Sequence, residues 1–587
     1  MEKFKKNLKE KPVRTIVRVL LVLFIITDVS RTCWHFFVIP ADESKDFVTT
    51  VDENKDSVTT VDESKNSVTP ADDKKSSGTS KVEREDLAEI VRPTYMIYYG
   101  VVNDEVIEKA VQYDIVILHP KQGNITREQV ERIQSGGAYV LGYISIGEDL
   151  RTNGMTPGQM LRDARFTGDG TGPRIDPREE GVMTLDHIAP QGNASPGGDG
   201  FASYYLDDND HNGKPDFNPN FNCAYTNMGD PAWFDVLDNM QIDGVDGIAG
   251  IREILTKEYG RGLGCDGLFL DTIDTCAPNS FTGDEEPHKT RFEWTAPGVA
   301  KFMERLEEQY PEKYILQNRG IFFYNYSHPH YAYSPGNYID FLMYESYMLD
   351  SNPTHLYSEG YFADNKNIYA PKLCAEAGRP DGFQVLSLGY AEGPVKFQLK
   401  ETLLGESDKG LEILMEDIDQ AQNKAGFSHY ITDGGLMLIN SFVIDHSGEE
   451  DHAPPEWSSV HNGSITWPRE EPIPRVGIGQ AEPVEDGMIV RWDVAMDRND
   501  VVYTLYYQKG PFDFTEDPDL EAAEKLELVP EVGEGYDYGA PPDTYPYQAV
   551  VTGLDSGDTY YFTIRARDCS AERNEEKNTI VLTGTPE

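Results

Sequence analysis

Short runs of apolar residues recur along the middle of the chain, and polar stretches with helical spacing separate them. The eight runs are Tyr95–Tyr99, Asp114–Leu118, Ala138–Ser145, Gly267–Leu270, Tyr314–Gln317, Tyr338–Tyr344, Phe383–Leu388 and Ser428–Ile431. Amphipathic helices are predicted between them, for example at Thr126–Gln134, Pro297–Tyr310 and Gly410–Ala425. Alternation of near-continuous apolar strands with helices predicts an α/β fold with a parallel sheet that is buried on both faces. Eight such units favour a closed (β/α)₈ TIM barrel over an open, doubly wound sheet, and we expect this barrel over residues 93–452.

One long interruption falls between the third and fourth predicted strands, at residues 151–222. It is rich in Gly, Asp, Asn and Pro, which favour turns over regular structure. Loops of this length in a compact domain are usually functional, so we expect a large excursion at the mouth of the barrel.

The C-terminal part of the chain, residues 475–587, has a different periodicity. Apolar and polar residues alternate at Met488–Trp492, Val502–Tyr507 and Tyr560–Ala566, as in strands with one buried face. These strands, with the corner from Leu554 to Phe562, resemble a fibronectin type III domain. We therefore predict a small all-β sandwich that follows a Pro-rich linker at residues 453–474.

The N-terminal part carries no core pattern. A basic stretch precedes the apolar run Val19–Ile26, which predicts a signal peptide or a signal anchor within residues 1–40. Residues 41–92 contain a sequence repeat with a period of ten residues, rich in Asp, Glu, Ser, Lys and Thr. Their composition is typical of a disordered stalk. We expect an extracellular or cell-surface protein, which contacts a membrane only through the N-terminal segment.

The formal net charge is −49, so the surface repels nucleic acid and attracts a cationic polymer. The alternative is that this acidity serves only to keep the protein soluble. The six cysteines contain no C-x-x-C spacing, which argues against a zinc–thiolate site. One or two disulfides are expected, with Cys265–Cys276 as the shortest loop, but the pairing stays open.

Candidate chemistry follows from the barrel itself, because function in this fold concentrates at the carboxyl ends of the strands. Asp271 ends the fourth predicted strand and Glu345 ends the sixth, so both carboxylates are expected at the barrel mouth. Glycosidic cleavage needs one carboxyl group that donates a proton and one carboxylate that attacks or activates water. Asp271 and Glu345 are the predicted catalytic pair. The structural alternatives are a helix cap for Asp271 and a salt-bridged rim residue for Glu345.

The same filter selects further polar and aromatic residues near the predicted strand ends. The candidate substrate-binding residues are Tyr99, Tyr143, Ser145, Glu148, Asp274, Gln317, Asn318, Tyr344 and Tyr390. We expect them to surround the two carboxylates.

Several of these motifs carry a family resemblance. The runs Tyr143–Glu148 and Asp266–Asp274, the segment Asp230–Trp233 and the pair Tyr344–Glu345 together resemble glycoside hydrolase family 114, the endo-α-1,4-polygalactosaminidases. The resemblance spans residues 93–445 and implies a TIM-barrel enzyme with Asp271 and Glu345 as its acidic residues. It also implies a galactosamine-containing polysaccharide as substrate. We expect a monomer that needs no cofactor for catalysis; the alternative is a non-catalytic surface protein for carbohydrate binding or adhesion.

A second constellation lies inside the 151–222 interruption, in the run Asp208–Asp216. Asp208, Asp210, Asn212 and Asp216 occupy positions 1, 3, 5 and 9 of a calcium loop, with Gly213 at position 6. Pro219 stands where the bidentate Glu of an EF-hand would be. The sequence therefore predicts a structural calcium site, and a metal-free turn rich in Asp and Asn is the alternative.

Overall fold

The computed structural model describes residue 87 and residues 90–586, apart from 178–191, 199, 209, 279–291, 326–327, 359–360, 380–381, 449–450, 458–476, 485–486 and 529–544. The predicted signal segment and the repeats that follow it lie outside the described residues. Within the described part, no helix combines the length and the hydropathy that a bilayer crossing requires.

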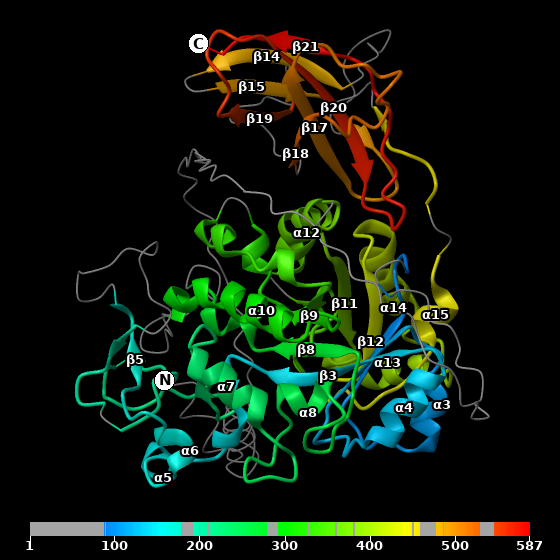
Figure 1. Ribbon diagram of the computed structural model, residues 1–587. Helices are drawn as coiled ribbons and strands as arrows, with labels where there is room; N and C mark the ends of the chain where they lie inside the picture. Colours follow the sequence, from blue (N-terminus) through cyan, green and yellow to red (C-terminus); the bar gives the residue numbers. More distant parts are fainter. Residues whose placement is uncertain are drawn as a thin grey trace, which may run out of the picture.

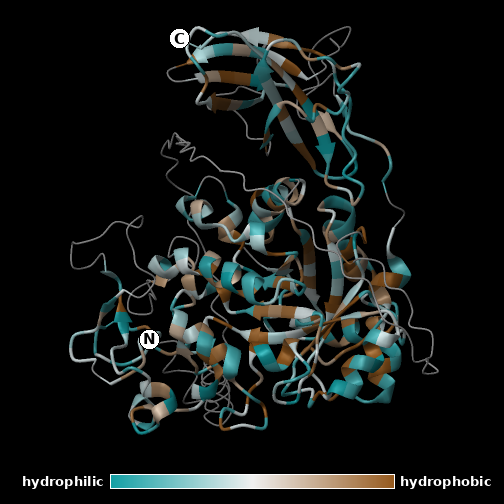
Figure 2. Ribbon diagram, viewed as in Figure 1, coloured by the Kyte–Doolittle hydropathy of each residue, from teal (hydrophilic) through white to brown (hydrophobic). Residues whose placement is uncertain are grey.

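Eight parallel strands form the centre of the larger domain (Figure 1). In sheet order they are β1 (Tyr95–Tyr98), β2 (Ile115–Leu118), β3 (Tyr139–Ser145), β8 (Gly267–Asp271), β9 (Tyr314–Asn318), β10 (Phe341–Glu345), β11 (Gln384–Tyr390) and β12 (Ser428–Thr432). Each of the eight predicted strands is confirmed. Figure 2 shows hydrophobic residues concentrated along these strands, as expected for a sheet that is covered on both faces.

At the seam between its first and last strands, the sheet closes through ring packing and a backbone hydrogen bond just beyond the strand ends. The rings of Tyr95 on β1 and Tyr430 on β12 lie 5.7 Å apart, and the Tyr99 backbone N–H donates to the Leu436 carbonyl at 2.8 Å. No backbone ladder joins β12 to β1 among the described residues. The strand order therefore supports a (β/α)₈ barrel whose seam is held by ring packing and this hydrogen bond.

Helices follow most strands. The main ones are α3 (Asp104–Ala110), α4 (Arg127–Ser135), α7 (Pro231–Asn239), α8 (Ile251–Leu255), α10 (Pro297–Gln309), α12 (Ala370–Ala377), α13 (Lys396–Leu403), α14 (Leu411–Ile418) and α15 (Phe442–His446). A capping box starts α4, in which Thr126 and Gln129 satisfy each other's backbone N–H groups. The residues described between β9 and β10 form the 3₁₀ turns η8 (Ile321–Tyr324), η9 (Pro329–Tyr333) and η10 (Gly336–Tyr338).

The excursion between β3 and β8 is larger than the interruption predicted from sequence, because it includes α7 and α8 as well. Its other elements are the strands β4 (Glu148–Asp149), β5 (Arg174–Ile175), β6 (Asn193–Ala194) and β7 (Ala224–Tyr225), the 3₁₀ turn η3 (Leu150–Thr152) and the helices α5 (Pro157–Met160) and α6 (Ala164–Thr167). Strand β4 pairs with β7 and β5 with β6, both antiparallel.

A buried ion pair anchors this excursion. Arg151 and Asp149 lie 2.8 Å apart, with side chains 3 % and 0 % exposed. The guanidinium lies near the Phe166 and Trp233 rings, at 5.3 and 5.7 Å, and the Tyr205 hydroxyl donates to Asp149 at 2.6 Å. The pair thus joins β4 to three aromatic residues of the excursion.

The C-terminal module is all-β, as predicted. One sheet contains β14 (Ile478–Val484), β15 (Gly487–Trp492) and β19 (Tyr547–Thr552); the other contains β17 (Val501–Lys509), β18 (Glu524–Leu528), β20 (Tyr560–Asp568) and β21 (Leu582–Gly584). Trp492, Tyr503 and Phe562 lie in the core that the two sheets share. Two residues of the predicted linker, in β13 (Glu456–Trp457), pair with β16 (Ala495–Met496). The assignment to the fibronectin type III class stays a prediction.

A disulfide joins the module to the barrel. Cys374 on α12 is bonded to Cys569, which directly follows β20, whereas Cys265 and Cys276 are free. The suggested Cys265–Cys276 pair is therefore not formed. Gly426 packs against the same junction: a Cβ there would lie 1.6 Å from the Cys569 carbonyl oxygen, so no larger residue fits. In Figure 1, α12 lies on the side of the barrel that faces the module.

Candidate active site

The two predicted catalytic carboxylates share one hydrogen-bond donor. The Asn318 side-chain amide, at the end of β9, donates to Asp271 Oδ1 at 2.8 Å and to Glu345 Oε2 at 2.9 Å. Two hydrogen bonds from one nitrogen place these oxygens at most about 6 Å apart. Asp271 ends β8 and Glu345 ends β10, so the strand between them carries the residue that bridges them.

Three tyrosines surround the two carboxylates. The Tyr143 hydroxyl donates to Asp271 Oδ2 at 3.0 Å, and the Tyr390 hydroxyl donates to Glu345 Oε1 at 2.7 Å. The Tyr99 ring lies 5.3 Å from the Tyr143 ring, edge to face. Each carboxylate is thereby held in place by neutral donors, and both keep part of their surface exposed to solvent.

Burial and like charge act together on Asp271. Desolvation raises its pKa, the neighbouring Glu345 raises it further, and the bonds from Asn318, the Thr272 backbone and Tyr143 oppose the rise. The pKa values of Tyr99, Tyr143 and Tyr390 are also raised, chiefly by burial and then by these carboxylates, so the three phenols remain donors. Burial and the nearby Glu345 carboxylate therefore both favour the protonated form of Asp271.

The backbone is strained directly after each of the three central site residues. Thr272, Arg319 and Ser346 have φ values of 69°, 58° and 57°. Such left-handed conformations in residues other than glycine cost on the order of 1 kcal/mol or more each. They turn the chain sharply at the ends of β8, β9 and β10, and the sharp turns fix the direction of the preceding carboxylates and amide.

Glu148 is a third acidic group at the same end of the barrel. Its side chain is 3 % exposed, and burial raises its pKa to about 8. Oε1 accepts from the Asn218 side chain at 2.7 Å, whereas Oε2 has no hydrogen-bond partner among the described residues. A small cavity of about 10 Å³, with room for about one water, is lined by Glu148, His119 and Tyr143.

We expect Glu148 to make stability depend on pH. The folded state holds the Glu148 proton up to about pH 8, whereas the unfolded state releases it near pH 4.5, so stability is lost as pH rises through this window. Each unit of pKa shift corresponds to about 1.4 kcal/mol. Glu148→Gln keeps an oxygen for Asn218 and removes the charge. The variant should show a flatter fall of the unfolding free energy between pH 5 and pH 8, measured by urea titration; equal slopes in both proteins would contradict the assignment.

Two of the predicted substrate-binding residues, Ser145 and Asp274, bond to other residues at the strand ends. Ser145 is buried and bonds to the Glu148 carbonyl at 3.0 Å and to Thr272 Oγ1 at 2.9 Å. Asp274 forms a 2.7 Å ion pair with Arg319. The structure thus uses Ser145 and Asp274 to brace the strand ends.

Gln317 and Tyr344 do not join the group around the carboxylates. Both are buried, and each precedes a site residue by one position, so alternation along the strand turns it to the opposite face. Gln317 accepts from the Tyr324 hydroxyl at 3.2 Å, and the Tyr344 hydroxyl donates to Asn365 at 2.7 Å.

One residue of the site is absent from the predictions. His119 directly follows β2, and its ring stacks on Tyr143 at 4.5 Å. Burial lowers its pKa to about 4, so it is neutral at physiological pH. The sequence does contain a signal for His119, because it is a polar residue at the carboxyl end of a predicted strand. The same criterion selected the other site residues.

The comparisons with known proteins give fold-level likeness only. No family model and no curated protein matches the chain. Similar solved structures include the glycoside hydrolase domain of PelA from Pseudomonas aeruginosa, with 16 % identity over 59 % of this chain and 98 % of that one at a TM-score of 0.34. The trehalose-6-phosphate hydrolase of Bacillus licheniformis has 11 % identity over 58 % of this chain and 64 % of that one, at a TM-score of 0.30.

An α-amylase from Geobacillus thermoleovorans has 7 % identity over 78 % of this chain and 96 % of that one, at a TM-score of 0.31. The first of the three is named as a glycoside hydrolase domain, the second as a hydrolase and the third as an amylase. At TM-scores this low the likeness decides no activity, and the strand pairings alone establish that this chain contains an eight-stranded parallel barrel.

Proposed function

We propose that this chain is an exported glycoside hydrolase that cleaves an amino-sugar polysaccharide within the chain, in the manner of an endo-α-1,4-polygalactosaminidase. The observation that carries the proposal is the amide of Asn318, which holds Asp271 and Glu345 together at the carboxyl end of the barrel. Two carboxyl groups at this spacing are what glycosidic cleavage requires.

The spacing also favours retention of configuration. Carboxyl groups about 5–5.5 Å apart leave no room for an attacking water between carboxylate and sugar, so one carboxylate attacks the anomeric carbon directly. The bond from that carbon to the leaving oxygen breaks as the other carboxyl group protonates the oxygen. The second group then takes a proton from water, and this water releases the sugar from the enzyme.

Charge and family resemblance support the substrate class. A protein with a net charge of −49 attracts a polymer of free amino sugars, and the resemblance to family 114 implies such a polymer. Tyr99 and Tyr143, both partly exposed beside Asp271, offer aromatic surface for a sugar ring.

The test is incubation of the full chain with galactosamine, N-acetylgalactosamine and glucosamine polymers, followed by mass spectrometry of the products. We expect oligosaccharides of mixed length from the galactosamine polymer, and NMR should show that the first-formed reducing ends keep the anomeric configuration of the substrate. Monosaccharide as the sole product would contradict endo cleavage. Binding of the polymer without any new reducing ends would favour an adhesion protein.

A further inference from the structure

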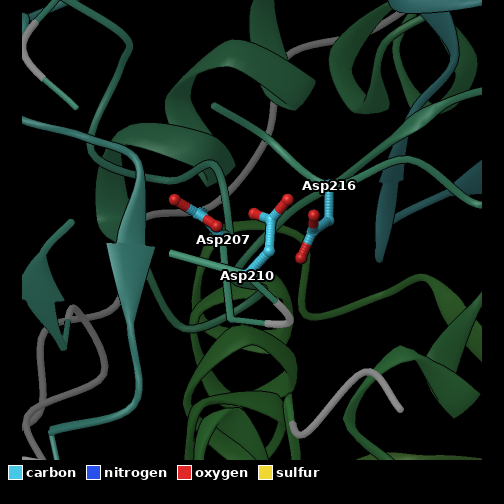
Figure 3. Close-up of side chains that lie close together, drawn as sticks. All are labelled: Asp207, Asp210 and Asp216. Carbon is cyan, nitrogen blue, oxygen red and sulfur yellow. The ribbon is translucent and has the colours of Figure 1, made fainter. Parts of the chain in front are cut away.

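The excursion between β3 and β8 brings three carboxylates together outside the candidate active site. One oxygen from each of Asp207, Asp210 and Asp216 lies within 4.8 Å of the others (Figure 3). Asp210 lies between the other two in this view. Two ligands that each lie 2.3–2.6 Å from one calcium ion can span about this distance.

Asp207 supplies an independent sign that a ligand belongs here. Its side chain is 0 % exposed, and Oδ2 accepts from Ser195 Oγ at 2.6 Å and from the Gly213 N–H at 2.8 Å. Its other oxygen, Oδ1, is buried and has no hydrogen-bond partner in the described part of the chain. A buried carboxylate oxygen without a partner, next to further carboxylates, is costly unless a cation compensates it.

We propose that Asp207, Asp210 and Asp216 bind a structural calcium ion. Three carboxylates suit a hard cation, and the set lacks the nitrogen and sulfur ligands that zinc prefers. Magnesium demands a stricter octahedral geometry with shorter bonds, whereas calcium accepts an irregular loop and completes its shell with carbonyl oxygens and water.

The ligand set differs from the one predicted by loop spacing. Asp210 and Asp216 belong to both sets, whereas the structure brings in Asp207 in place of Asp208. The Asp208 backbone N–H donates to Asp216 Oδ2 at 3.1 Å, and the Asn212 side chain donates to Asp210 Oδ2 at 2.6 Å. Asp208 and Asn212 therefore bond to the cluster and lie outside the group of three.

The ion would stiffen the segment that supports Glu148. The Tyr225 N–H on β7 donates to the Asp216 carbonyl at 3.0 Å, and β7 pairs with β4, which begins at Glu148. Asn218, two residues after Asp216, donates to the Glu148 carboxylate. Calcium at Asp216 would thus fix both contacts of this segment with the barrel mouth.

The test uses the full chain after treatment with a chelator. Isothermal titration with calcium chloride should show a saturable site with one ion per chain, and calcium should raise the midpoint of thermal unfolding more than magnesium does at equal concentration. Asp210→Asn, at an exposed position, should weaken calcium binding at least about tenfold while leaving the midpoint in chelator unchanged.

The matched control is Asp558→Asn, an exposed Asp in the module that should keep the affinity of the unaltered chain. No calorimetric signal and no midpoint shift with calcium would overturn the proposal. Equal affinity of Asp210→Asn and the unaltered chain would also overturn it, because binding would then occur elsewhere. Neither readout depends on glycosidase activity, so the proposed function and the calcium site can fail separately.

Discussion

Asp271→Asn and Glu345→Gln should each lower turnover of the polysaccharide by about 10³-fold or more while the protein still binds it. Each amide has nearly the shape of the carboxylate that it replaces, so Asn318, Tyr143 and Tyr390 keep a partner in the site. In the proposed mechanism, each substitution removes either the group that attacks the anomeric carbon or the group that moves the proton. Release of reducing ends measures turnover, and calorimetry with the polymer measures binding.

Added azide separates the two roles. In the variant that lacks the attacking carboxylate, azide should restore activity with inverted configuration of the glycosyl azide; in the variant that lacks the proton donor, the azide product should keep its configuration. Asp235→Asn and Glu412→Gln, at exposed positions on α7 and α14, are the matched controls and should leave turnover unchanged. Full turnover in either active-site variant would refute the assignment of that residue.

Asp149→Asn should lower the free energy of unfolding by about 3–5 kcal/mol. The substitution keeps the shape of the side chain but leaves the buried Arg151 guanidinium without its main counter-charge. The other carboxylate paired with Arg151 is that of Asp246, and its oxygen lies 3.4 Å from the guanidinium nitrogen. The expected loss exceeds that from breaking a surface ion pair. Phe166 and Trp233 lie against the Arg151 guanidinium, so water cannot solvate its unpaired charge.

Urea titration followed by tryptophan fluorescence measures this loss. Glu105→Gln is the control, since it breaks an exposed pair with Lys109 and should cost at most about 0.5 kcal/mol. Replacing both residues, as Asp149→Asn with Arg151→Met, should recover part of the loss, because no buried charge then lacks a partner. A loss of less than about 1 kcal/mol in Asp149→Asn would contradict the buried pair as an anchor.

The barrel strands could be predicted because each is buried on both faces and is therefore apolar along its length. The same reasoning placed Asp271 and Glu345, since a polar residue that ends such a strand lies at the barrel mouth. Alternation along a strand would also have separated Asn318 from Gln317 and Glu345 from Tyr344, had it been applied to each residue in turn.

The excursion could not be predicted in the same way. The pairing of β4 with β7 joins residues more than 70 positions apart through two-residue strands, which leave no periodic signal. Asp207 entered the carboxylate cluster because the fold of the whole segment, and not the spacing of the loop alone, decides which side chains converge. The Cys374–Cys569 bond likewise depends on how the module packs against α12.

That bond also decides what a protease can release. Cys374 and Cys569 are separated by 195 positions, and the linker between the barrel and the module lies inside this span. A single cut anywhere in the span nicks the chain but frees neither piece, so a nicked molecule would migrate as one band until a thiol reductant is added. Separation of the module from the barrel by a cut in this span would therefore require reduction as well as proteolysis.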